Sequence, residues 1–239
     1  MVPYMSRFKQ FIKNYWEYYK ELEDEFLQTR KCVDFQKGNF NTYSVEFLKL
    51  FQAACSEIDV LGKAMAVEVN PSFMPDDKKN NITKWWYEVH RNYQYYESIS
   101  TMENGVSLSA AKVVFLDDEE MVPWVDFETE LYQAKNGTMR YRAVEGKSTP
   151  KWWRDYNMVK HNRTLPIKND TGRTYYTKAN LGNTLSAFAA LFILEKAFMA
   201  HIGELTEREA FAGRSRLFEK VEKATSEDID ALINGLDPL

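Results

Sequence analysis

Cysteine is scarce in this chain of 239 residues, which contains only Cys32 and Cys55. Two cysteines can form neither a disulfide framework nor a cysteine-rich metal cluster, and they fit the reducing conditions of the cytosol. We therefore predict a cytoplasmic protein that needs no metal and no other cofactor.

Long hydrophobic runs are equally scarce. The one long stretch without a charged residue, Ala179–Leu194, has 16 residues and contains several Asn, Thr and Ser. It is too short and too polar to span a bilayer, so it predicts a buried core helix. The N-terminal stretch MVPYMSRFKQFIKNYW lacks the continuous apolar core and small-residue cleavage site of a signal peptide. These features predict no membrane association.

The chain as a whole also lacks the excess of positive charge that is typical of nucleic-acid-binding proteins, because its net charge is −4. Residues 135–178 differ from the rest, with eleven Lys and Arg against three Asp and Glu. This segment carries +8 and the remainder of the chain −12. Such a segment could dock an anionic substrate, although a solvated basic surface explains the same count.

Apolar residues recur at intervals of three to four in most of the chain, which is typical of amphipathic helices. Thr42 or Ser44 can cap the second of these helices, and Asn70-Pro71 ends it. Thr149 and Pro150 supply a cap and a first-turn proline for a later one. The predicted helices cover residues 8–26, 44–70, 82–99, 150–163, 178–205 and 216–234.

Residues 103–146 follow a different pattern, with β-rich runs around an acidic turn in AKVVFLDDEEMVPWVDF and alternation in TMRYRAV. They predict a small antiparallel β insertion. The expected fold is therefore mainly α, a single helical domain over residues 1–239 with a β-rich insertion at about 103–146.

The stretch KWWRDYNMVKHNR, from Lys151 to Arg163, brings an arginine and a histidine into one helix. Arg154 and His161 are seven positions apart, which places them within about 20° of the same azimuth and about 10 Å apart along the axis. Arginine can hold a phosphate, and histidine can move a proton near neutral pH. The pair therefore predicts a phosphate-handling face.

An arginine that is followed by a polar residue and then, within a few positions, by a histidine resembles the hallmark of HEPN domains (higher eukaryote and prokaryote nucleotide-binding). RDYNMVKH matches this pattern, and YNMVKHNR, YSVEFLKLFQAACSEID and YYKELEDEFLQT look like parts of bacterial HEPN-like proteins. The resemblance implies a HEPN-like helical bundle that dimerises. The β insertion departs from the minimal bundle.

The resemblance also implies a metal-independent endoribonuclease, such as a toxin or phage-defence effector that a partner protein inhibits. Arg154 would stabilise charge on the phosphate, His161 would transfer protons, and Asp155 or Asn157 would orient groups. A homodimer would place two Arg–His faces across one cleft. Three further basic residues would bind the RNA substrate: Lys151, Lys160 and Arg163.

Other interpretations stay open at the level of sequence. The same fold could be a non-catalytic HEPN-like module that binds a nucleotide, RNA or a partner protein. His161 could also be a structural histidine at a helix C-terminus, as we expect His90 and His201 to be structural. Glu57 and Asp59 lie within an apolar helix and could pair with Arg154 or contribute to a metal site.

Overall fold

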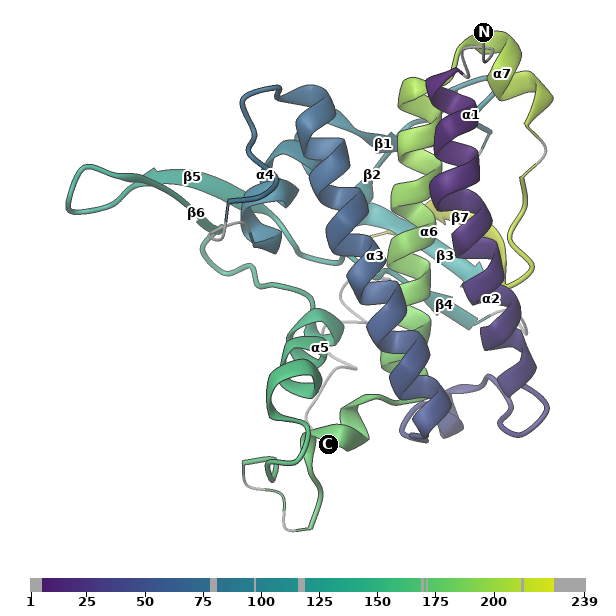
Figure 1. The fold of residues 1–239 in the computed structure, drawn as a ribbon, viewed down its shortest axis with the longest axis vertical. Helices are drawn as coiled ribbons and strands as arrows, with labels where there is room; N and C mark the ends of the chain where they lie inside the picture. Colours follow the sequence, from purple (N-terminus) through teal and green to yellow (C-terminus); the bar gives the residue numbers. More distant parts are fainter. Residues whose placement is uncertain are drawn as a thin grey trace, which may run out of the picture.

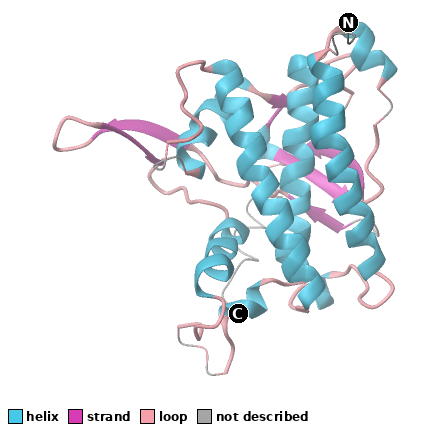
Figure 2. Cartoon of the chain, in the orientation of Figure 1, coloured by secondary structure: helices cyan, strands magenta, loops and turns pink. Residues whose placement is uncertain are grey.

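The computed structural model describes residues 6–77, 81–96, 98–115, 119–168, 170, 172–211 and 213–225. The chain is mainly helical, as the periodicity predicts, with small antiparallel sheets (Figures 1 and 2). The long helices lie side by side, a sheet packs behind them, and helix α5 and a β-hairpin extend from one flank (Figure 1).

The N-terminal helix is continuous but not uniform. It comprises α1 (Arg7–Phe11), a π-helical turn (Ile12–Trp16) and α2 (Glu17–Thr29). Its buried face carries aromatic and aliphatic residues at helical spacing, which confirms the helix predicted over residues 8–26. A π-helical turn inserts one residue into the helical repeat and shifts the register of the buried face.

Helices α3 (Val45–Val69) and α6 (Leu181–Ile202) form the centre of the bundle and pack along each other. The Ser44 hydroxyl accepts a hydrogen bond from the Phe47 amide at 3.0 Å and caps α3, which ends at Asn70 before Pro71. The side chain of Asn180 caps α6 in the same way. Helix α6 is long and apolar enough to cross a membrane by composition, but 83% of its most apolar window is buried inside the fold.

The region around residues 94–145 contains most of the strands. β1 (Gln94–Tyr95) pairs with β2 (Val106–Ser107), and β5 (Thr129–Gln133) pairs with β6 (Met139–Ala143). β3 (Ala111–Phe115) is the central strand of a sheet with the order β4-β3-β7, in which β4 is Glu119–Met121 and β7 is Phe218–Lys223. All pairings are antiparallel. The β structure is therefore not a self-contained insertion, because strands on both sides of residues 103–146 complete it.

Two predicted helices need correction. Helix α4 spans Ile82–Asn92 rather than 82–99, because Tyr93 is extended, its hydroxyl donates to the Met65 carbonyl at 2.9 Å, and β1 follows.

The helix predicted over 216–234 is wrong over 218–223, where β7 pairs with the second edge of the fully buried strand β3. A buried strand needs partners for its backbone groups on both edges. Residues 226–234 lie outside the described residues, and α7 (Leu205–Ala210) ends the helical region.

Candidate active site on helix α5

Helix α5 (Lys151–Asn162) is attached to the fold by its aromatic residues. The Trp152 indole donates to the Pro123 carbonyl at 2.7 Å, and its ring contacts the buried Trp124 ring edge-on, with centroids 5.2 Å apart. Trp153, Tyr156 and Val159 are also buried. Because a buried indole N–H needs an acceptor, these contacts set the rotation of α5 about its axis. The expected cap at Thr149 is wrong: Pro150 occupies the N-cap position, without a side-chain hydrogen bond.

The fully exposed residues of α5 are three basic residues and a histidine. Lys151, Arg154, Lys160 and His161 all lie at the surface. Neither Arg154 nor His161 makes a side-chain hydrogen bond or an ion pair with any residue in the part of the chain that the structure describes. Lys160 instead lies over the Tyr156 ring, with its Nζ 5.4 Å from the centroid. Both residues of the predicted pair are therefore free to contact an external ligand.

Asp155 belongs to a structural contact between α5 and α6. Its carboxylate accepts a hydrogen bond from the Asn183 side chain at 3.0 Å, and the same amide group donates to the Lys178 carbonyl at 2.7 Å. Asp155 follows Arg154 by one residue, so it points about 100° away from it around the helix. This carboxylate orients Asn183 in the first turn of α6.

Asn157 and Arg163 are also tied to the backbone. The Asn157 side chain donates to the Trp153 carbonyl, one helical turn earlier, at 3.0 Å. Arg163 is half-buried, and its carbonyl accepts from the Tyr176 amide at 3.1 Å. Its Nε is buried, with no hydrogen-bond partner among the residues described. The seven residues predicted for the site thus divide into four exposed side chains, on Lys151, Arg154, Lys160 and His161, and three residues that make contacts within the fold, Asp155, Asn157 and Arg163.

A groove with a volume of about 440 Å³ runs between α3, the first turn of α4 and α5. Arg154, Asn157 and Lys160 border it on the α5 side, and Asp59 borders it on the α3 side. His161 is not among the residues that line it. The groove therefore has two cationic side chains, Arg154 and Lys160, on its α5 side.

Glu57 and Asp59 do not pair with Arg154. Asp59 forms a salt bridge with Lys63 and accepts a hydrogen bond from the Trp85 indole at 3.1 Å. Burial raises the pKa of the half-buried Glu57 carboxyl. Across the described ranges, no group of three or more His, Cys, Asp or Glu side chains is arranged to hold a metal ion.

The other two histidines have structural surroundings. His90 stacks on Trp86 with ring centroids 5.9 Å apart, its Nδ1 lies 2.7 Å from the Trp86 carbonyl, and burial lowers its pKa. The His201 ring lies 4.6 Å from the Tyr93 ring, and burial lowers its pKa as well.

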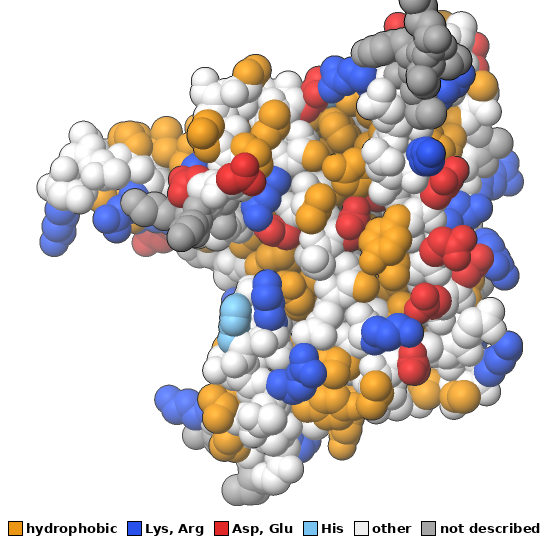
Figure 3. Space-filling model, in the orientation of Figure 1, with side chains coloured by type: hydrophobic (Ala, Val, Ile, Leu, Met, Phe, Trp, Pro, Cys, Tyr) orange, Lys and Arg blue, Asp and Glu red, His pale blue; other side chains and the backbone are white. Residues whose placement is uncertain are grey.

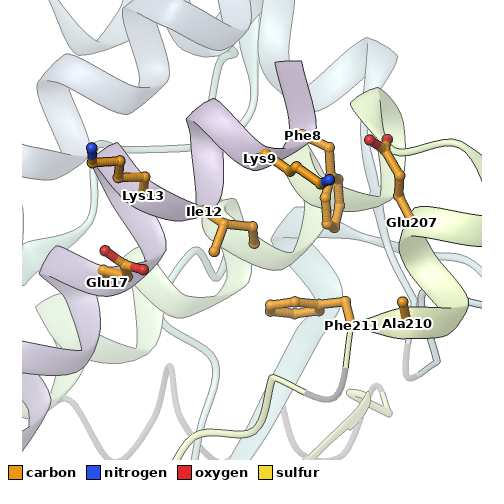
Figure 4. A pocket seen from close by; sticks show the side chains of 8 residues that line it. All are labelled: Phe8, Lys9, Ile12, Lys13, Glu17, Glu207, Ala210 and Phe211. Atoms are coloured by element: carbon orange, nitrogen blue, oxygen red, sulfur yellow. The ribbon is translucent and has the colours of Figure 1, made fainter. Parts of the chain in front are cut away.

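Two features were not found from the sequence. The first is a groove of about 380 Å³ between α1 and α7, where Phe211 meets Phe8 edge-on with centroids 5.8 Å apart (Figure 4). It depends on how the chain after α6 folds back, and no local pattern indicates this. The second is Glu195, a fully buried carboxyl on α6. In the sequence, Glu195 and Lys196 directly follow the uncharged run Ala179–Leu194 of the predicted core helix, and this position indicates that Glu195 is buried.

Comparisons with protein-family models, curated proteins and solved structures give no match to this chain. The geometry of α5 and its RDYNMVKH motif are therefore the features that point to a function.

Proposed function

We propose that this protein is a HEPN-like, metal-independent endoribonuclease whose catalytic residues are Arg154 and His161. The observation that supports the proposal most is their exposure, without partners, on the same side of a helix whose other side is buried by tryptophans. A buried arginine or histidine usually has a hydrogen-bond partner within the fold, whereas these two side chains are open to solvent and can contact a substrate.

The chemistry assigns one task to each residue. The RNA 2′-hydroxyl attacks the adjacent phosphorus, the bond to the 5′ oxygen breaks, and a 2′,3′-cyclic phosphate and a 5′-hydroxyl result. Arg154 stabilises the charge that develops on the phosphate oxygens. His161 transfers a proton, either from the attacking hydroxyl or to the leaving oxygen.

One imidazole cannot conveniently serve as base and acid at the same time, because the two protons move on opposite sides of the phosphorus. A two-fold dimer would supply a second Arg154 and a second His161 to the same cleft. We therefore propose that the active form is a homodimer with the exposed face of α5 in its interface cleft.

The test is cleavage of single-stranded RNA in EDTA by the wild type, His161→Ala, Arg154→Ala and, as a matched control, His201→Ala. We expect the first two substitutions to reduce the rate by about 10² to 10⁴-fold. Both side chains are exposed, so the free energy of unfolding should change by less than about 1 kcal/mol. His201→Ala should keep the wild-type rate. Normal cleavage by His161→Ala would rule out this assignment.

One observation favours a second candidate, an RNA-binding module that does not cut. Asp155 and Asn157, the polar residues next to the pair, already donate or accept hydrogen bonds within the fold. A protein that retains RNA through Arg154 and Lys160 but leaves it intact in the cleavage assay would support this alternative.

A further inference from the structure

The β5–β6 hairpin projects from the body of the molecule as an arm (Figure 1). It turns at residues 134–138, where the Ala134 amide donates to the Thr138 carbonyl at 2.9 Å and Gly137 has a φ of +79°. The arm is attached at its base, where Tyr141 contacts Tyr87 of α4 with ring centroids 5.3 Å apart. A projecting hairpin buries little of its own surface, so packing against the fold does not account for the residues on its exposed face.

The register of the hairpin separates its side chains into two faces. Leu131 lies opposite Tyr141 and Gln133 opposite Met139, which makes one face largely apolar. Tyr132 lies opposite Arg140, and Glu130 opposite Arg142, on the other face. The Arg142 guanidinium covers the Tyr132 ring at 4.6 Å from its centroid. We call Tyr132, Arg140 and Arg142 the arm cluster.

The arm cluster combines stacking surface with positive charge. Arg142 is partly neutralised by Glu130, at 2.7 Å, but Arg140 is exposed and forms no ion pair with the residues that the structure places. Aromatic rings and guanidinium planes accept stacked bases, and the cation binds phosphate. This combination is typical of surfaces that hold single-stranded nucleic acid.

Basic side chains lie on the arm and on α5, on both sides of a hollow in the surface (Figure 3). Lys and Arg side chains lie along the side of the arm that faces α5, hydrophobic side chains lie along the other side, and the surface is hollowed between the arm and α5 (Figure 3). Lys and Arg side chains also occur over the region of α5 (Figure 3). Of the eleven basic residues at 135–178, only Arg142, Lys147 and Arg173 form salt bridges within the described chain. Of the eight that form no salt bridge with the described residues, Arg140 lies on the arm, and Lys151, Arg154 and Lys160 lie on α5.

We propose that the hollow between the arm and α5 binds single-stranded RNA, with the arm cluster stacking a base and holding backbone phosphates beside the bond that Arg154 and His161 cleave. The inference rests on the proposed function for its substrate class, but it concerns binding and can fail separately. RNA is favoured over a protein partner because Arg140 and the exposed residues of α5 place positive charge on both sides of the hollow, and the Tyr132 ring with its Arg142 guanidinium offers a stacking surface for a base.

The test measures binding of a labelled single-stranded RNA of about 16 nucleotides by fluorescence anisotropy, in the His161→Ala background so that no cleavage occurs. Adding Tyr132→Ala should weaken binding about tenfold at every salt concentration, since stacking is not ionic. Adding Arg140→Ala should weaken binding and reduce the slope of log Kd against log salt by about 0.7.

Two controls separate the arm cluster from general effects. Met139→Ala changes the opposite face of the same hairpin, where this side chain is 51% exposed, and should leave Kd unchanged. Lys13→Ala removes one exposed positive charge from the N-terminal helix and should leave the salt slope unchanged.

The proposal is overturned if the His161→Ala protein does not bind RNA, or if Tyr132→Ala and Arg140→Ala bind as Met139→Ala does. It is also overturned if the arm substitutions alter only self-association, because the arm would then be a protein interface. Arm-dependent binding by a wild type that cuts no RNA would support this inference and contradict the nuclease. Cleavage at the wild-type rate by the arm variants would support the nuclease and contradict this inference.

Discussion

Glu195 is an unusual residue for the centre of a helical bundle. Its carboxyl is fully buried on α6, and neither oxygen has a hydrogen-bond partner among the described residues. Burial, and then the charge of Glu57, raise the pKa of Glu195 well above 4.5. The next residue, Lys196, is buried elsewhere, donates to the Gly213 carbonyl at 3.3 Å and has a pKa lowered by burial to about 8. Glu195 is therefore best accommodated in its neutral, protonated form.

This assignment predicts that Glu195→Gln stabilises the fold at neutral pH. The folded-state pKa lies above the unfolded value, so the contribution of Glu195 to stability is greatest below about pH 4.3 and is lost as pH rises toward the folded pKa. Glutamine carries no charge and avoids this loss. The free energy of unfolding of the variant minus that of the wild type, measured by urea denaturation, should be more than about 1 kcal/mol larger at pH 7 than at pH 4. A difference between variant and wild type that does not change with pH would contradict the assignment.

At the scale of elements, a second buried carboxylate attaches the C-terminal strand to the N-terminal helix. Glu23 on α2 accepts hydrogen bonds from the Tyr19 hydroxyl at 2.9 Å, from the Arg216 amide at 3.0 Å and from the Ser215 hydroxyl. The Leu217 amide adds a longer bond at 3.3 Å. These donors lie immediately before β7, so Glu23 positions the strand that completes the β4-β3-β7 sheet.

We expect Glu23→Ala to destabilise the protein by about 3 kcal/mol, because hydrogen bonds to a charged group are strong and their buried donors would be left unpaired. The neighbouring Asp24→Ala is the matched control: it removes only an exposed ion pair with Arg216 and should cost less than about 1 kcal/mol. Thermal unfolding measures both. Equal losses from the two substitutions would show that Glu23 does not hold the strand.

At the scale of the whole molecule, the proposed active site is incomplete in one chain. His90 lies on α4 against the Trp86 ring, and His201 lies at the end of α6 against the Tyr93 ring, so α5 carries one histidine, His161. A second chain is the simplest source of a second imidazole.

We expect inactive subunits to reduce the activity of wild-type subunits with which they form mixed dimers. When equal amounts of wild type and His161→Ala exchange subunits, about a quarter of the dimers keep both histidines, so activity should fall to about a quarter of that of the same total concentration of wild type. A monomeric enzyme would keep half. Sedimentation at high micromolar concentration gives the independent check, and a monomer there would contradict the paired site.

The sequence by itself determined the features that depend on neighbouring residues. Ser44 and Pro71 delimit α3 because capping and proline act within one turn, and the apolar spacing predicts the buried faces of the long helices. The same spacing predicts that Arg154 and His161 share one face of α5, since azimuth depends only on sequence separation.

Only the tertiary structure decided what depends on distant residues. β7 is a strand because β3, about a hundred residues earlier, has a buried edge that needs a partner, and helix periodicity in 216–234 carries no information on that need. Asp155 faces Asn183 rather than substrate, and Tyr93 ends α4 by bonding to Met65, through contacts between separate helices. The direction in which the β5–β6 arm projects is set in the same way, by the contact of Tyr141 with Tyr87 of α4. Local hydrogen bonds act over about four residues, whereas burial and strand pairing act between any segments that folding brings together.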